Sequence, residues 1–184
     1  LLAYPLAYLL ATLPERSANL LMILVLLPFW TSVLVRIAAW IVLLQSNGLI
    51  NQFLMGLGLI DTPLQLVFNR IGVYISMVHI MLPFMVLPLY ANLVKMDFRL
   101  LEAAYDLGTT PFKAFWLITV PLSKAGIVAG FMLVFIPSVG EFVIPSLLGG
   151  PENIMIGRVV WDEMFTANNW PRASALAVVM IALI

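Results

Sequence analysis

Residues 71–94 read IGVYISMVHIMLPFMVLPLYANLV and contain no aspartate, glutamate, lysine or arginine. The hydrocarbon core of a bilayer is about 30 Å thick, and an α-helix needs roughly 20 apolar residues to cross it. The stretch therefore predicts one transmembrane helix. It contains Pro83 and Pro88, which a spanning helix tolerates where neighbouring helices or a polar path satisfy the freed backbone groups.

Further charge-free stretches lie on both sides of this one. They occupy residues 1–13, 18–35 and 173–184, and 125–147 is a fourth apolar stretch with Glu141 as its one charged residue. Together with 71–94 they predict an all-α, polytopic membrane protein with about five spans. The stretches at the two ends are short for a span, so we expect residues 1–184 to be a single transmembrane domain cut from a longer chain.

The composition excludes several classes of protein. Of the 184 residues, 63% are apolar and 10% are charged, and the mean hydropathy is +1.08. This apolar excess excludes a soluble globular domain and makes the lipid bilayer the solvent for much of the surface. Nine basic and nine acidic residues give a net charge of zero, which excludes the basic face that nucleic-acid binding needs. The chain has no cysteine and His79 is its single histidine, which argues against a metal site or a Ser-His-Asp triad.

The basic residues are distributed unevenly between the two sides that alternating crossings predict. One side receives segments 14–17 and 95–124, with the cations Arg16, Lys95, Arg99, Lys113 and Lys124. The other side receives segments 36–70 and 148–172, and a short interfacial helix is expected over 49–57. The density of cations is roughly twofold higher on the first side, which the positive-inside rule places in the cytoplasm.

Segment 95–124 has the pattern of a short helix that ends in a glycine. Asp97 is expected to cap a helix over 98–107, whose apolar residues recur at helical spacing. Gly108 follows and is expected to end this helix in the left-handed conformation that glycine adopts without strain.

A second short helix follows the glycine. Thr110 is expected to cap it, with Pro111 at its first position. The helix is expected to cover 112–119 and to end before Pro121, and Ser123 is expected to cap the next span. The resulting corner is either a loop folded against its own spans or a rigid surface on which a soluble partner docks.

The corner also carries a motif with fixed spacing. Its residues are Glu102, Ala103, Ala104, Gly108, Ile118, Val120 and Pro121. The motif resembles the EAA loop of binding-protein-dependent ABC importer permeases, EAA-x3-G-x9-I-x-L-P, with Val120 in place of leucine. The resemblance covers essentially the whole chain, which looks like such a permease domain without its first span and the end of its last.

The resemblance implies a transporter subunit of a bacterial inner membrane that is not itself an enzyme. Residues 95–123 are then a cytoplasmic loop that docks on two ATPase subunits, which bind ATP and magnesium, while this chain binds no cofactor. The sequence has no G-x4-G-K-[ST] phosphate cradle. The other implied partners are a second, related permease subunit in a heterodimer and a periplasmic or extracellular binding protein. The residues assigned to ATPase coupling by the resemblance are Glu102, Ala103, Ala104, Gly108, Ile118 and Pro121.

Three further stretches bear on the substrate. They are FIPSVGEFVIPSLLGGPENIMIGRVVW at 135–161, LLPFWTSVLVR at 26–36 and LPFMVLPLY at 82–90. They are similar to the putrescine and spermidine permeases of bacterial polyamine importers, and GEFVIP is nearest to the putrescine type. Two alternatives stay open: an ABC permease for another small solute, such as iron or an amino acid, and an ion-coupled secondary carrier. An intramembrane enzyme is disfavoured because Ser138 has no nearby base except His79.

Glu141 is the strongest candidate for contact with a cationic substrate. It lies toward the outer end of 125–147, next to a glycine and between two prolines. Ionisable residues in spans usually face the bundle interior or a water-filled path, and a carboxylate with freed carbonyls suits a polyammonium ion. The alternative is that Glu141 caps a helix or pairs with Arg36 at the outer interface.

The other candidates for the substrate path are Trp40, Tyr74, Trp161 and Asp162. The aromatic rings have the chemistry for cation–π contacts, but residues of an interfacial aromatic belt have the same pattern. Asp162 adjoins Trp161 in the outer segment, where it either meets the binding protein or is solvated. His79 is expected to be a hydrogen-bonded packing residue.

Gly126 and Gly130 form a small-x3-small pair in the stretch 125–147. This spacing places both glycines on one face of a helix, where a neighbouring helix approaches closely.

Overall fold

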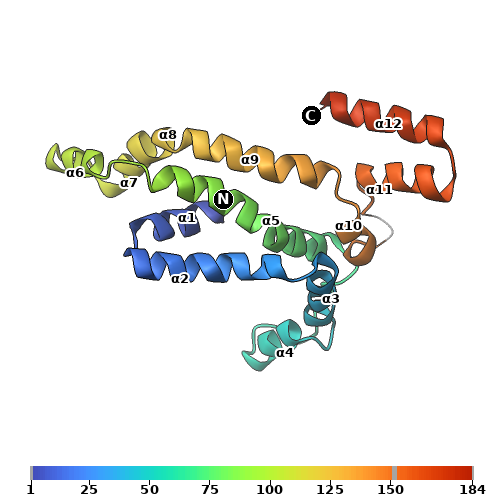
Figure 1. Ribbon diagram of the computed structural model, residues 1–184. Helices are drawn as coiled ribbons and strands as arrows, with labels where there is room; N and C mark the ends of the chain where they lie inside the picture. The colour runs from blue at the N-terminus through green and yellow to red at the C-terminus, as the bar shows by residue number, and fades with distance from the viewer. Residues whose placement is uncertain (1, 151–152, 184) are drawn as a thin grey trace. The chain divides into compact units, whose positions relative to one another are not determined.

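Every regular element in the described part of the chain is a helix, and residues 2–150 and 153–183 of the computed structural model are described (Figure 1). The elements are α1 (Ala3–Thr12), α2 (Glu15–Leu26), η1 (Leu27–Trp30), α3 (Val33–Leu44), α4 (Leu49–Gly56), α5 (Arg70–Leu93), α6 (Arg99–Asp106), α7 (Pro111–Ala114), η2 (Phe115–Thr119), α8 (Val120–Leu122), α9 (Lys124–Val139), α10 (Val143–Leu148), α11 (Ile156–Trp161), η3 (Asp162–Thr166) and α12 (Trp170–Leu183). The expected all-α fold is confirmed for these residues.

The contacts divide the chain into two compact units. Unit 1 comprises Leu1–Leu27 and Met81–Val134, and unit 2 comprises Pro28–Ile80 and Phe135–Ile184. Helices α5 and α9 contribute residues to both units. The motif-bearing corner belongs to unit 1, and all candidates for the substrate path belong to unit 2.

Two helices of the described chain have the length and apolarity needed to cross a membrane. They are Val33–Gly56, in which residues 45–48 separate α3 from α4, and Arg70–Leu93, which is α5. A third crossing is obtained if Pro111–Leu122 and Lys124–Val139 are one span with a bend of 66°. A shorter apolar helix, Trp170–Ala182, covers most of the span expected over 173–184. Residues 33–56, most of which were expected outside the membrane, thus have the properties of a span.

The single span expected over 18–35 is wrong. Helix α2 ends at Leu26, a 3-10 turn follows over Leu27–Trp30, and α3 begins at Val33. Pro28 has no backbone N–H, so it interrupts the α-helical ladder. Its carbonyl accepts both the backbone N–H of Thr31, at 3.2 Å, and the Thr31 hydroxyl, at 2.7 Å.

Helix α5 is the centre of unit 1, with α1 and α9 packed against it (Figure 1). The buried contact to α1 joins one apolar face of each helix, formed by Ala3, Ala7, Leu10, Val86, Leu89 and Leu93. The contact to α9 occurs at the two glycines. A Cβ atom on Gly126 would lie 2.9 Å from the Pro88 carbonyl oxygen, and one on Gly130 would lie 2.7 Å from the Met85 sulfur. The small-x3-small prediction is therefore confirmed.

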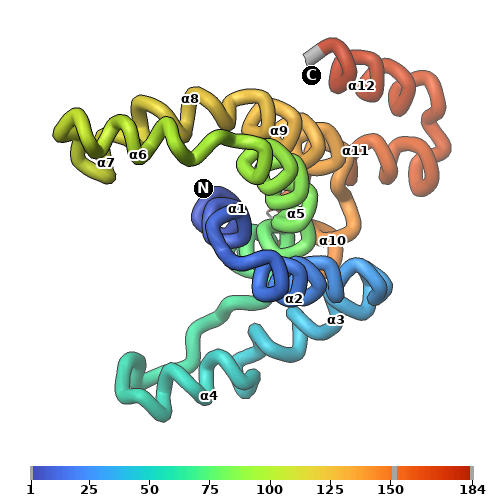
Figure 2. The backbone as a smooth tube through the Cα atoms, turned by 60° about the vertical axis from the view of Figure 1, so that its left-hand side comes forward, coloured from blue at the N-terminus to red at the C-terminus, as the bar shows by residue number. Residues whose placement is uncertain are grey.

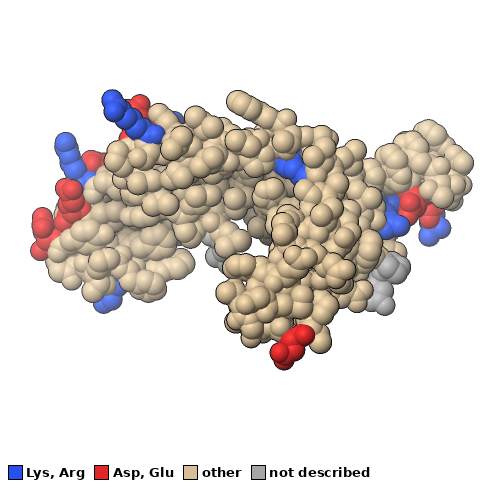
Figure 3. Space-filling model, turned by 90° about the horizontal axis from the view of Figure 1, so that it is seen from below, with Lys and Arg blue, Asp and Glu red and all other residues tan. Residues whose placement is uncertain are grey.

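The charged residues of unit 1 gather at one end, where α1 meets α2, α5 ends and α9 begins. In Figure 3 the blue and red side chains cluster at the end of the unit that carries α6 and α7. The residues are Glu15, Arg16, Lys95, Asp97, Arg99, Glu102, Asp106, Lys113 and Lys124. Segments 14–17 and 95–124 therefore share an end of the unit, as the distribution of charges along the sequence predicts.

Unit 2 is held together by a small apolar core and a buried amide. The core includes Ile37 and Leu44 of α3 and Ile144 and Leu148 of α10, all fully buried. The side chain of Asn51 is also fully buried, and its amide nitrogen donates to the carbonyls of residues 45 and 64, while its oxygen accepts the N–H of residue 64. This fixes the segment that follows α4 against that helix.

Candidate functional site

The corner between α6 and α7 has the local geometry that its sequence predicts. The Asp97 carboxylate accepts the backbone N–H of Arg99, at 3.0 Å, but the N-cap of α6 is Phe98, one residue later than expected, and the helix covers Arg99–Asp106. Gly108 has a φ of +80°, the left-handed conformation. The Thr110 hydroxyl then accepts the N–H of Lys113, at 3.4 Å, and Pro111 is the first residue of α7. The two short helices thus meet at a fixed bend.

The motif residues divide into an inner and an outer set. Ala104 is only 8% exposed and packs with Leu101 and Ala114, and Ile118 contacts this cluster. These side chains hold α6 against α7 from inside the corner, where small alanines allow the helices to approach.

The outer set faces away from the unit. Its motif members are Glu102, Ala103, Gly108 and Pro121, all exposed. Large apolar side chains lie beside them, including Leu107, which is 86% exposed, and Phe112. An exposed apolar patch next to a carboxylate has the composition of a protein-binding surface rather than of a solvated loop. Figure 2 shows α6 and α7 together at one end of unit 1.

Two expectations for the chain after the corner are wrong. The second helix does not end before Pro121: it continues from α7 through a π-helical turn, η2, into α8, which ends at Leu122. A proline is tolerated in the first turn of a new helical segment because its missing N–H has no partner there. The Ser123 hydroxyl does not cap α9 and instead donates to the Val120 carbonyl, at 3.0 Å.

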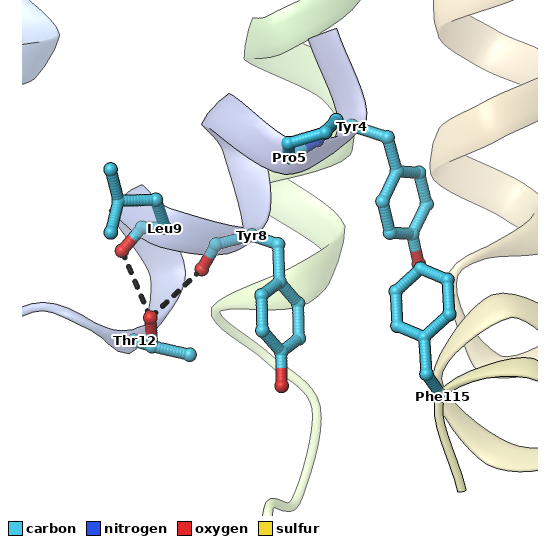
Figure 4. A pocket seen from close by; sticks show the side chains of 6 residues that line it. All are labelled: Tyr4, Pro5, Tyr8, Leu9, Thr12 and Phe115. Carbon is cyan, nitrogen blue, oxygen red and sulfur yellow. Dashed lines mark hydrogen bonds between the residues drawn. The ribbon is translucent and has the colours of Figure 1, made fainter. Parts of the chain in front are cut away.

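A set of contacts between α1 and the chain after the corner was not predicted from the sequence. We call these contacts, made by Tyr4, Tyr8, Phe115 and Ser123, the clasp. The Tyr4 hydroxyl lies 2.7 Å from the Ser123 hydroxyl, and the Tyr4 and Tyr8 rings contact the Phe115 ring edge-on, with centroids 5.4 and 6.1 Å apart. A cavity of about 540 Å³ opens beside these rings and is lined by Tyr4, Pro5, Tyr8, Leu9, Thr12 and Phe115 (Figure 4). The only sequence signal was the pair of tyrosines one helical turn apart in an apolar stretch.

Glu141 lies at the break between α9 and α10. Its carboxylate accepts the backbone N–H groups of Val143, at 2.8 Å, and Ile144, at 3.2 Å. This is the capping alternative for Glu141. Pairing with Arg36 does not occur in the described structure, where Nε and Nη1 of that arginine are buried without a hydrogen-bond partner. The side chain of Glu141 remains partly exposed.

Trp161 and Asp162 lie close to this break. The Trp161 ring stacks on Phe142, with centroids 4.5 Å apart and an angle of 14° between the rings. Gly157 of α11 is so close to the carbonyls of residues 140 and 141 that a Cβ atom would lie 2.6 and 3.1 Å from their oxygens. Asp162 forms an ion pair with Arg158, at 3.6 Å. We call Glu141, Trp161 and Asp162 one neighbourhood, because Glu141 adjoins Phe142, on which Trp161 stacks, and Asp162 follows Trp161 in the chain.

The other two candidates for the substrate path, Trp40 and Tyr74, are not among the residues of this neighbourhood. The Trp40 indole N–H donates to Nδ1 of His79, at 3.1 Å, so the expected packing role of this histidine is confirmed. Tyr74 is 64% exposed. Within residues 2–150 and 153–183, no group of three or more histidine, cysteine, aspartate or glutamate residues is placed to hold a metal ion.

Comparison with known proteins adds a family and several relatives. Residues 3–184 match the family model of the binding-protein-dependent transport system inner membrane component. The chain is 43% identical to the spermidine/putrescine transport system permease protein PotB of Salmonella typhimurium (strain SL1344) over 97% of its length and 62% of the relative's. It is 42% identical to PotB of Escherichia coli (strain K12), over 97% and 65%, and 39% identical to PotB of Haemophilus influenzae (strain ATCC 51907), over 100% and 64%. The chain thus spans less than two thirds of the length of these relatives.

Proposed function

The chain belongs to the family of binding-protein-dependent transport system inner membrane components, and from this membership we propose that it forms part of the polyamine path of an ATP-driven importer. The corner of unit 1 is the observation that carries the proposal. Its bend is fixed by Gly108 and by the Thr110 cap, and its exposed outer set contains Glu102 and Ala103. A rigid, partly apolar corner of this kind suits the docking of a soluble ATPase.

In this proposal the corner faces the cytoplasm and contacts one of two ATPase subunits. Those subunits bind ATP and magnesium and hydrolyse ATP, and this chain binds no cofactor. Closure of the ATPase dimer pushes on the corner and switches the spans between inward- and outward-open states. A second permease subunit completes the path, and a periplasmic or extracellular binding protein delivers the substrate.

Polyamines are the proposed substrates because the three PotB relatives named above carry spermidine and putrescine in their names. The neighbourhood of Glu141, Trp161 and Asp162 supports this, since carboxylates and a stacked indole attract an elongated polyammonium ion. Putrescine is the preferred member in our proposal, on the likeness of residues 140–145 to permeases of the putrescine type.

The direct test uses the full-length subunit, co-purified with its genomic neighbours and reconstituted in liposomes. We expect uptake of labelled putrescine to require ATP and the binding protein, and excess spermidine to compete less well than unlabelled putrescine. Uptake of sulfate or of a sugar in place of polyamines would contradict the substrate. Uptake driven by an ion gradient without the ATPases would contradict the importer class.

A pair of substitutions at Glu141 separates its capping role from contact with the substrate. Glu141→Gln keeps an oxygen that accepts the Val143 N–H but removes the charge, so we expect the KM for putrescine to rise about tenfold with little loss of thermal stability. Glu141→Ala also removes the cap and should lower the free energy of unfolding by about 1 kcal/mol. An unchanged KM in the glutamine variant would show that Glu141 is only a cap.

A further inference from the structure

The chain between the corner and α9 contains a helical turn of unusual register. Residues Phe115–Thr119 are π-helical, and the backbone N–H of Val120 donates to the carbonyl of Phe115, five residues earlier. The π-helix is rare, and its single turns within α-helices are frequently found at functional sites. This turn joins the corner to α9, the helix that packs on α5. The register of the turn therefore sets the orientation of the corner relative to α9.

One side chain in the turn is unsatisfied in this register. Thr119 is fully buried, and its hydroxyl has no hydrogen-bond partner among the described residues. In an α-helix a threonine hydroxyl commonly donates to the carbonyl four residues earlier, which is that of Phe115. In the π register of this structure the Thr119 hydroxyl does not make this bond. An α-helical register would therefore give the hydroxyl a partner that it lacks here.

Contacts with α1 favour the π register. Because the Ser123 hydroxyl donates to the Val120 carbonyl, the Tyr4 hydroxyl is the donor in its bond to Ser123. Tyr4 also contacts the Phe115 ring, as does Tyr8. Helix α1 thus holds the first residue of the π turn and the residue that follows α8. The cavity beside Phe115 leaves room for its ring to move when this clasp opens (Figure 4).

We propose that the π turn Phe115–Thr119 is a two-state hinge, with the clasp of Tyr4, Tyr8, Phe115 and Ser123 stabilising the π register and the Thr119 hydroxyl stabilising an α register. Conversion between the registers rotates the corner relative to α9. This inference rests on the proposed function, in which closure of the ATPase dimer pushes on the corner and drives the conversion. The hinge is a positioning device and does not contact the substrate.

The two stabilising groups predict opposite effects when each is removed. Thr119→Val deletes a hydroxyl that lacks a partner in the π register, so it should shift the register equilibrium about fivefold toward π, and Thr119→Ser should restore it. Tyr4→Phe keeps the ring and deletes the bond to Ser123, so it should shift the equilibrium about fivefold toward α. Ser76→Ala is the matched control, because its hydroxyl is also buried and unpartnered but lies in unit 2.

The absence of cysteine from the chain makes these equilibria measurable. Spin labels at Arg99→Cys and Val128→Cys, both exposed positions of unit 1, report the distance between α6 and α9 in the assembled, full-length transporter. We expect two distance populations, with their ratio shifted by a non-hydrolysable ATP analogue and by the Thr119 and Tyr4 variants in opposite directions. The Ser76→Ala control should leave the ratio unchanged.

The outcomes separate the hinge from the proposed function. A single distance that responds to neither nucleotide nor variants, in a transporter that still imports polyamine, would overturn the hinge alone. A wild-type subunit that binds no ATPase would instead contradict the proposed function. Should both Thr119 variants shift the ratio equally, the hydroxyl would have no part in the hinge.

Discussion

Under the proposed function, a Gly108→Val variant should import polyamine about 10- to 100-fold more slowly than the wild type. Gly108 has a φ of +80°, where a β-branched side chain costs of order 1–3 kcal/mol. No atom lies within 4 Å of an added Cβ, so the cost arises from the backbone and not from a clash. We expect the corner to relieve this cost by opening its bend, which in the proposed function misaligns Glu102 and Ala103 with the ATPase. Uptake into liposomes measures the loss.

The matched control is Gly108→Asn, because asparagine tolerates the left-handed conformation. We expect its uptake to stay within about twofold of the wild type. Co-purification with the ATPase separates lost docking from lost folding: the valine variant should insert and resist heat normally but retain little ATPase. Normal uptake by the valine variant would show that the bend is not needed for coupling.

We expect Gly126→Leu to be the most destabilising substitution in unit 1. An added Cβ would lie 2.8 Å from Cβ of Asn92 and 2.9 Å from the carbonyl oxygen of Pro88. Because the second contact is with backbone, α9 and α5 must separate to relieve it. Overpacking typically costs 1–3 kcal/mol and more where backbone must move, so we expect a loss of about 3 kcal/mol or more.

Unfolding in detergent, followed by circular dichroism, measures this loss. Gly56→Leu is the matched control, because nothing lies within 4 Å of a Cβ atom at that helical glycine. Its free energy of unfolding should change by about 0.5 kcal/mol or less. Equal stabilities of the two leucine variants would mean that α9 does not depend on close approach to α5.

The sequence predicted best those features that are determined locally. The left-handed Gly108, the Thr110 cap and the position of Pro111 each depend on residues within one helical turn. The face formed by Gly126 and Gly130 was predictable for a similar reason, since small residues four apart are useful mainly for close helix packing.

Features that depend on distant contacts or on small energy differences were not predictable. The Tyr4–Ser123 bond joins residues 119 positions apart. The π register of Phe115–Thr119 and the break before α3 lie in apolar sequence, where hydropathy is uniform and does not locate the end of a helix. Glu141 has a side chain suited to either of two roles, and its role as the cap of α10 is visible only in the folded chain.

The gathering of charge at one end of unit 1 also bears on how this unit enters the membrane during synthesis. Its acidic and basic side chains lie in the α1–α2 turn, in residues 95–113 and at the start of α9. With the corner in the cytoplasm, as proposed, insertion of unit 1 transfers only apolar and neutral polar side chains into lipid. Insertion then avoids the penalty of about 2.5–3.5 kcal/mol for each charge placed at the centre of a spanning helix.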